Sequence, residues 1–231
     1  LLGHRVELAD GGTRDVLGIF RTERTAIWDD AARAAAIAHF AHGGAAPLML
    51  KADSVATVHR RVPMDLIVLP VREGGAIVGV SVHAGLWTSA GLAAPSDKVP
   101  LLRRRLADLE EKYGFDPAGH AGKALHHALS ALPHDLLIAL DPPALETAAL
   151  TAMSLADRPR PKLLLLPSPL RRHLFAFVWL PRDELTTARR HAIGELLADA
   201  AQATVSSWAI HLDVGELALI RYTLDVPADA A

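Results

Sequence analysis

The period of the hydrophobic pattern changes twice along this chain, and this change constrains the fold most strongly. Up to about residue 95, short apolar runs with β-branched residues alternate with turn residues, as is typical of strands. From about residue 96 to 158, apolar residues recur every three or four positions, which is the spacing of amphipathic helices. The remaining residues return to strand-like runs around one helical segment. This segregation predicts an α+β fold made of three parts: a β-rich domain (1–95), a helical connector (96–158) and an α+β domain (159–231).

In the first part, the pattern predicts a helix at about Ala26–Phe40 and then strands that include a hairpin. The expected strands are Leu48–Lys51, Val55–Arg61, Leu66–Val71 and Ala76–Trp87. A break near Ala52–Ser54 separates the first two strands. Gly74 and Gly75 supply the positive φ angles that a tight hairpin turn requires, so the last two strands should form a hairpin. We expect a loop at Leu92–Pro95.

In the middle part, helix start and stop signals predict three helices. The first begins at Pro100, buries Leu102, Leu106, Leu109 and Tyr113, and ends at Gly114. The second covers about Gly119–Leu132. The third has Asp141 as its N-cap and Pro142 at its first position.

The last part follows a strand–strand–helix–strand–strand order. Its expected elements are Lys162–Leu166, His173–Leu180, a helix at about Thr187–Ala200, Thr204–Leu212 and Glu216–Val226. This order predicts a small sandwich with one antiparallel sheet.

Composition excludes several functional classes. The net charge of −2 gives no general electrostatic attraction to nucleic acid or to an anionic membrane. Cysteine is absent, which excludes disulfides, thiol nucleophiles and thiolate metal sites. No apolar run approaches the roughly 18 residues of a membrane helix. The first residues resemble no signal peptide and lack an initiator Met, so we expect a cytoplasmic segment cut from a longer protein.

The motifs of common catalytic sites are also absent. No Gly-x-Gly-x-x-Gly dinucleotide fingerprint, phosphate loop, His-Glu-x-x-His zinc helix or Gly-x-Ser-x-Gly nucleophile elbow occurs. We therefore assign no catalytic, cofactor-binding or metal-binding residue. His120, His126, His127 and His134 lie close in sequence, but no carboxylate at ligand spacing supports a metal site, and exposed imidazoles on an amphipathic helix explain them better.

The candidate ligand or interdomain residues are His59, Arg60 and Arg61. Two arginines near the end of a strand can clamp a carboxylate or phosphate by bidentate hydrogen bonds. The alternative is that these side chains are solvated or contact acidic groups of an adjoining domain.

Seven strings, in this order, resemble the large bacterial NAD-specific glutamate dehydrogenases. They are Thr57–Asp65, Gly85–Ala90, Val99–Arg104, Gly114–Pro117, His120–Leu125, Leu132–Leu136 and Val178–Asp183. The resemblance implies that the three parts are a PAS-like domain, a helical connector and an ACT-like, ferredoxin-like domain from the non-catalytic N-terminal region. It also implies that the nicotinamide and glutamate sites lie in a catalytic domain far towards the C-terminus.

The resemblance implies a regulatory and structural role. The parent protein would use NAD, whereas this segment would hold no cofactor. Its partners would be the remaining domains of the same polypeptide, further subunits of a homo-oligomer, and an amino-acid effector. The alternative is a free-standing amino-acid sensor module. A free-standing hydrolase is a third reading, which no nucleophile motif supports.

Overall fold

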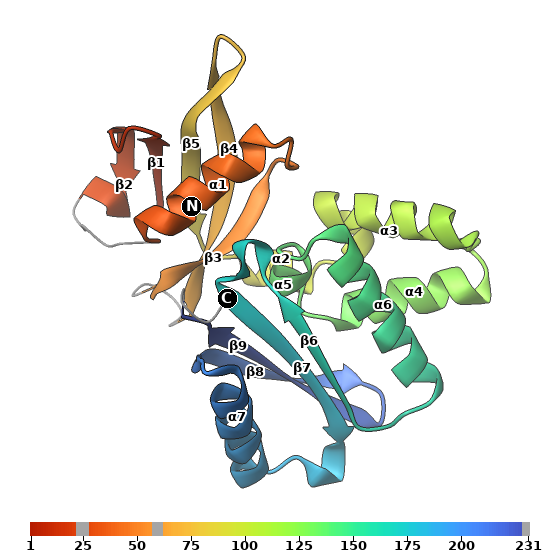
Figure 1. Ribbon diagram of the computed structural model, residues 1–231. Helices are drawn as coiled ribbons and strands as arrows, with labels where there is room; N and C mark the ends of the chain where they lie inside the picture. Colours follow the sequence, from red (N-terminus) through yellow and green to blue (C-terminus); the bar gives the residue numbers. More distant parts are fainter. Residues whose placement is uncertain (22–27, 57–61, 228–231) are drawn as a thin grey trace. The chain divides into compact units, whose positions relative to one another are not determined.

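The computed structural model describes residues 1–21, 28–56 and 62–227 (Figure 1). The chain divides into two compact units, Leu1–Trp87 and Thr88–Ala231. Each unit contains its own antiparallel sheet with a helix packed on it. This arrangement confirms the predicted α+β fold, in which a β-rich part, a helical part and an ACT-like part follow one another.

The first unit is built on a five-stranded antiparallel sheet with the strand order β2-β1-β5-β4-β3. Its strands are β1 (Gly3–Leu8), β2 (Thr13–Gly18), β3 (Leu48–Val55), β4 (Pro63–Glu73) and β5 (Ala76–Gly85). The predicted hairpin is confirmed as β4–β5. Gly74 and Gly75 at its turn have φ angles of 57° and 89°, the left-handed region that favours glycine.

One face of this sheet is covered by helix α1 (Asp30–Ala41). The Asp29 side chain caps the helix by accepting a hydrogen bond from the Ala32 amide at 2.7 Å. Ala36 and Phe40, one helical turn apart, are buried on the helix, as are Val80 and Val82 on β5. A short 3₁₀ turn, η1 (Ile19–Arg21), follows β2.

Three local predictions for the first 95 residues were wrong. The helix begins at Asp30 rather than near Ala26, because Asp29 is the N-cap. Strand β3 continues through the predicted break at Ala52–Ser54, where its pairing with β4 shifts register instead of ending. The predicted loop at Leu92–Pro95 overlaps helix α2 (Ser89–Ala93), which the Thr88 side chain caps.

The second unit begins with a helical part. Its helices are α2, α3 (Pro100–Tyr113), α4 (His120–Ala131), α5 (His134–Leu137) and α6 (Pro142–Asp157), with the 3₁₀ turn η2 (Ser96–Lys98). The predicted signals are confirmed: Gly114 ends α3 with a φ of 63°, and the Asp141 side chain accepts from the Ala144 amide at 2.8 Å. Tyr113 was wrongly placed on the buried face. It is 39% exposed, and its hydroxyl donates to the Glu146 carboxylate.

The rest of the second unit is a four-stranded antiparallel sheet with the order β6-β7-β9-β8. Its elements are β6 (Lys162–Pro167), η3 (Pro169–Arg171), β7 (His173–Pro181), η4 (Arg182–Glu184), α7 (Thr187–Ala201), β8 (Thr204–Val214) and β9 (Leu217–Asp225). The predicted order of two strands, one helix and two strands is confirmed.

The two central strands of this sheet are buried on both faces. Alternate residues of a strand point to opposite faces, so Tyr222 of β9 lies on the α7 side and Arg221 on the other. On the α7 side, Tyr222 belongs to a core cluster that includes Leu197 of the helix. On the other side, Phe177 and the residues two places before and after it are fully buried, and Arg221 pairs with Asp135 of α5 at 2.9 Å. This ion pair links the helical part to the sheet.

Leu197 should contribute strongly to stability because it is the α7 residue at the centre of the core cluster. We expect Leu197→Ala to reduce the free energy of unfolding by about 2–4 kcal/mol through lost burial and a residual cavity. Leu196, its neighbour on the same helix, is 66% exposed. Leu196→Ala is therefore the matched control, with an expected change within about 0.5 kcal/mol. Equal losses in chemical denaturation of both variants would contradict this packing.

Candidate functional site

The residues predicted as ligand candidates, His59, Arg60 and Arg61, lie outside the described residues. Their role therefore stays a prediction. The histidines of the middle part do not gather: His126 pairs with Glu110 at 2.9 Å, His120 is exposed and His134 is buried. Within the described ranges, no group of three or more His, Asp or Glu side chains is placed to hold a metal ion.

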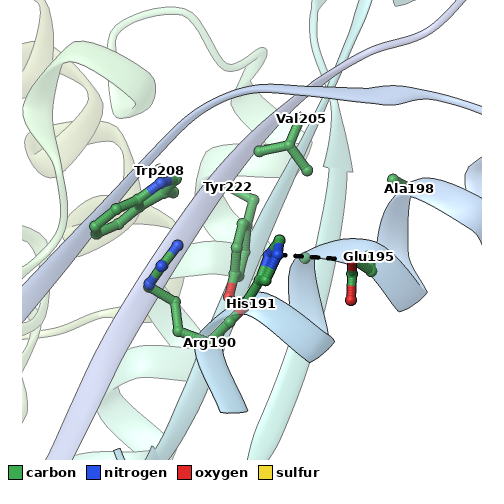
Figure 2. A pocket seen from close by; sticks show the side chains of 8 residues that line it. Arg190, His191, Glu195, Ala198, Val205, Trp208 and Tyr222 are labelled. Carbon is green, nitrogen blue, oxygen red and sulfur yellow. Dashed lines mark hydrogen bonds and ion pairs between the residues drawn. The ribbon is translucent and has the colours of Figure 1, made fainter. Parts of the chain in front are cut away.

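A pocket lies in the second unit between α7 and the strands β8 and β9 (Figure 2). We call it the α7 pocket. Its volume is about 490 Å³. Its lining residues are Arg190, His191, Gly194, Glu195, Ala198, Val205, Trp208 and Tyr222.

The sequence of α7 explains why the pocket exists. Residues four apart lie on one face of a helix, so Arg190, Gly194 and Ala198 form a stripe along α7. The two inner positions carry almost no side chain, which leaves space between the helix and the sheet. Gly194 also permits close packing, because a Cβ atom there would lie 3.1 Å from Cε1 of Tyr222.

Two interactions fix the position of Arg190 at one end of the pocket. Its guanidinium lies over the indole ring of Trp208, with Cζ 3.8 Å from the ring centroid, which is close cation–π geometry. Its main-chain carbonyl accepts a hydrogen bond of 2.6 Å from the Tyr222 hydroxyl. Burial raises the pKa of Tyr222, so this hydroxyl stays protonated and able to donate at neutral pH.

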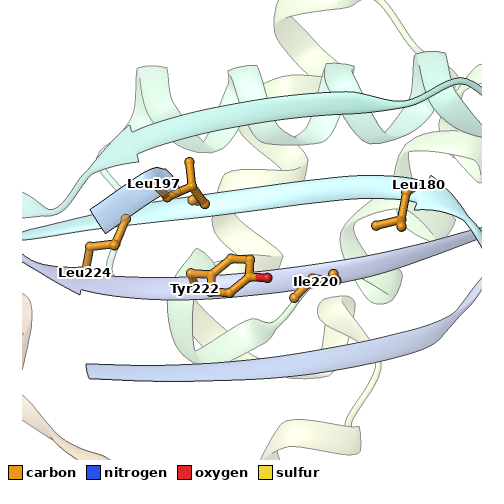
Figure 3. Packing of buried hydrophobic residues seen from close by; sticks show 6 residues of the cluster. Leu180, Leu197, Ile220, Tyr222 and Leu224 are labelled. Atoms are coloured by element: carbon orange, nitrogen blue, oxygen red, sulfur yellow. The ribbon is translucent and has the colours of Figure 1, made fainter. Parts of the chain in front are cut away.

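The floor of the pocket continues into the hydrophobic core of the unit. Tyr222 lies in a row along β9 with Ile220 and Leu224, and Leu197 of α7 and Leu180 of β7 lie on the same side of the sheet (Figure 3). The aromatic ring thus belongs to the core, whereas the Tyr222 hydroxyl reaches the helix backbone. The pocket therefore has a floor built of core residues and a rim made of side chains on α7.

The rim of the pocket carries an imidazole and a carboxylate. Nε2 of His191 lies 3.6 Å from a carboxylate oxygen of Glu195, one helical turn later, and both side chains are largely exposed (Figure 2). The lining includes no hydroxyl or thiol nucleophile beside a base: its one hydroxyl, on Tyr222, donates to the backbone.

A polar cluster lies on the sheet of the first unit, on the face opposite α1. His4 on β1 and His83 on β5 are paired across the strands, with ring centroids 4.4 Å apart. Nε2 of each ring lies near the Ser81 hydroxyl oxygen, at 2.9 Å for His4 and 3.1 Å for His83. Burial, and secondarily the nearby His4, lower the pKa of His83.

A smaller pocket of about 210 Å³ includes His83 in its lining. Its other lining residues are Leu1, Asp65, Ile67, Gly85, Leu86 and Trp87. Asp65 forms an ion pair of 2.5 Å with Lys51 on the neighbouring strand. The carboxylate of this pocket is therefore already balanced by a cation of the same sheet.

Sequence reasoning missed both clusters. The spacing of Arg190, Gly194 and Ala198 was a usable signal for the first, because a charged residue followed at helical spacing by two small ones indicates a groove. Strand alternation would have placed Ser81 and His83 on one face. Nothing local could have brought His4 beside them, since it is 77 residues from Ser81.

Two family models match consecutive parts of the second unit. The model described as glutamate dehydrogenase, helical motif 1, matches residues 99–158, and the model described as glutamate dehydrogenase, ACT2 domain, matches residues 162–231. The first covers α3 to α6, and the second covers the sheet with α7. The division between the two models thus falls where the helical part ends.

The curated relatives that match this chain are also glutamate dehydrogenases. An NAD-specific glutamate dehydrogenase of Halomonas elongata is 29% identical over 170 residues, or 73% of this chain and 10% of the relative. One of Pseudomonas aeruginosa is 27% identical over 177 residues, 76% of this chain and 11% of the relative. One of Mycobacterium tuberculosis is 24% identical over 143 residues, which make up 62% of this chain and 9% of the relative. The chain spans about a tenth of the length of these relatives. In the part of the chain that the structure describes, no helix is long and apolar enough to cross a membrane.

The lowered pKa values of His134 and His83 predict how stability depends on pH. Burial lowers the pKa of His134 in the second unit as it does that of His83 in the first. A histidine with a lowered folded-state pKa binds fewer protons in the folded than in the unfolded state. The free energy of unfolding should therefore fall as the pH drops below about 6.5, the ordinary pKa of histidine.

The measurement is chemical denaturation at several pH values between 8 and 5, where ordinary carboxylates stay ionised. His83→Gln should reduce the loss of stability of the first unit on acidification. His120→Gln, at an exposed position, is the control and should leave that loss unchanged. A wild-type chain with constant or rising stability on acidification to pH 5 would show the assignment to be wrong.

Proposed function

Because the chain belongs to the NAD-specific glutamate dehydrogenase family, as a piece of its N-terminal region carrying helical motif 1 and the ACT2 domain, we propose that it is a regulatory and structural segment of such an enzyme. The whole enzyme would oxidise glutamate to 2-oxoglutarate and ammonia and reduce NAD to NADH. The segment itself would take no part in that chemistry.

One observation carries this proposal: two models of the same family match in succession, over residues 99–158 and 162–231. Together they account for most of the second unit and meet where the helices end and the sheet begins. We place catalysis, and the NAD site, in other domains of the polypeptide, and the protein in the cytoplasm.

Exposed apolar side chains on the ACT-like sheet support assembly with further domains or subunits. Leu163 and Leu165 on β6 are 45% and 44% exposed, and Leu212 on β8 is 49% exposed. Both strands are edges of the sheet, whose unpaired backbone groups can accept another strand. We propose that these edges are covered in the whole protein by other domains of the same polypeptide and by the subunits of a homo-oligomer.

A free-standing amino-acid sensor is the second candidate, and the α7 pocket is the observation that favours it. The mass of the native protein separates the two candidates. An antibody against this chain should detect, on a denaturing gel of cell lysate, a band many times larger than 24.7 kDa. On a native gel, the protein that the antibody detects should migrate at a multiple of that larger mass, as a homo-oligomer would. A band near 24.7 kDa would refute the segment proposal and favour the sensor.

The non-catalytic role predicts that the isolated chain neither binds NAD nor turns over glutamate. Titration calorimetry with NAD up to about 1 mM should give no saturable heat, whereas a cofactor-binding domain would bind within that range. A full-length NAD-specific glutamate dehydrogenase serves as the positive control. Saturable binding at micromolar NAD would contradict the assignment of the NAD site to other domains.

A further inference from the structure

We propose that the α7 pocket binds a small carboxylate whose apolar or planar body lies on Trp208 while Arg190 holds the carboxylate group. This inference deepens the regulatory role proposed above and rests on it for its biological meaning. The binding itself depends on the pocket alone.

The guanidinium of Arg190 is positioned and has free hydrogen-bond donors. With Cζ 3.8 Å from the ring centroid, the indole of Trp208 covers one side of the guanidinium, and the N–H groups on its other sides remain available to a ligand. No carboxylate of the described residues forms an ion pair with Arg190; its recorded hydrogen bond uses the main-chain carbonyl instead. Donors in this planar fork match the two oxygens of a carboxylate, so a carboxylate is the natural ligand.

The space beside Arg190 has the size and character of a small-molecule site. About 490 Å³ lies within the range of known ligand pockets. Ala198 and Val205 give it apolar walls, and the indole of Trp208, which is 49% exposed, offers a flat surface. A ligand with an apolar or aromatic body would cover this surface and gain the free energy of removing it from water.

The ligand carboxylate could belong to an α-amino acid or to a 2-oxo acid, and the residues on the rim favour the two differently. Glu195 lines the pocket one turn after His191 and offers an acceptor to a ligand ammonium group. An α-amino acid would bind by its carboxylate to Arg190 and gain only a longer-range attraction between its ammonium and Glu195, whereas a 2-oxo acid would use Arg190 alone. Because Glu195 is exposed, this attraction should have a small effect, and the carboxylate contact should dominate.

The test uses the indole N–H signal of Trp208 in NMR spectra of the 231-residue chain. Trp208→Phe assigns this signal, and the indoles of Trp28 and Trp179, which are 5% and 0% exposed, serve as internal references. The probes are benzoate and benzamide, which share shape but differ in charge. Benzoate should shift the Trp208 signal saturably at roughly millimolar concentration, and benzamide should bind roughly tenfold or more weakly.

Two variants and a matched control locate the binding. Arg190→Ala should weaken benzoate binding roughly tenfold or more, and Ala198→Leu, which retains Arg190 but fills the pocket, should abolish it. Arg189→Ala removes the same charge from the adjacent position, whose side chain pairs with Glu184 outside the pocket, and should bind benzoate as the wild type does. Unchanged signals of Trp28 and Trp179 verify that each variant is folded.

Three results would overturn the proposal: no shift of Trp208 with about 10 mM benzoate, an equal response to benzamide, or equal losses from Arg189→Ala and Arg190→Ala. L-Leucine and 4-methyl-2-oxopentanoate, compared at the same signal, then show which source fits better. Failure of this titration leaves the segment proposal standing, because that proposal is decided by the mass of the native polypeptide.

Discussion

The burial of strands β7 and β9 on both faces is the constraint on which the second unit depends. An antiparallel sheet can leave one face in water, but Phe175, Phe177 and Trp179 on one side and Tyr222 on the other are almost entirely buried. Helix α7 covers one side, and it forms the cluster around Leu197. The opposite side includes Arg221, whose pairing with Asp135 brings α5 to the sheet. The helical motif and the ACT-like domain therefore share a buried sheet, although two family models describe them separately.

The approach of α7 to that sheet also determines the α7 pocket. Glycine within a helix costs about 1 kcal/mol relative to alanine, yet Gly194 lies in the middle of α7. A Cβ atom at this position would lie 3.1 Å from the Tyr222 ring, so the bare backbone allows the helix to pack on the tyrosine. The same absence of side chains at Gly194 and Ala198 leaves the groove next to β8 unfilled. Close packing and an open pocket thus have one cause, and Arg190 at the end of the stripe gives the groove its charge.

The sequence predicted elements well wherever a local chemical signal marks them. Gly74 and Gly75 defined a hairpin turn, and Asp141 with Pro142 defined the start of α6, because capping and turn chemistry involve residues only a few positions apart. Tyr113 was misplaced because its helical spacing suggested burial, whereas its partner Glu146 lies 33 residues away. The candidate site was not predicted for a similar reason: Arg190 and Trp208 meet only after β8 has paired with β9 under α7.

Strand β9 is the element through which the pocket and the helical motif can influence each other. Tyr222 faces the pocket and bonds to the backbone of Arg190, while Arg221, its neighbour in sequence, faces the opposite side and pairs with Asp135. A ligand shifts an equilibrium only by its difference in affinity for two conformations. A carboxylate bound by Arg190 would favour the conformation in which Arg190 lies over Trp208, and the Tyr222 hydrogen bond ties that conformation to the position of β9. Under the regulatory role proposed above, a ligand in the α7 pocket would therefore act on the helical motif through the contact between β9 and α5.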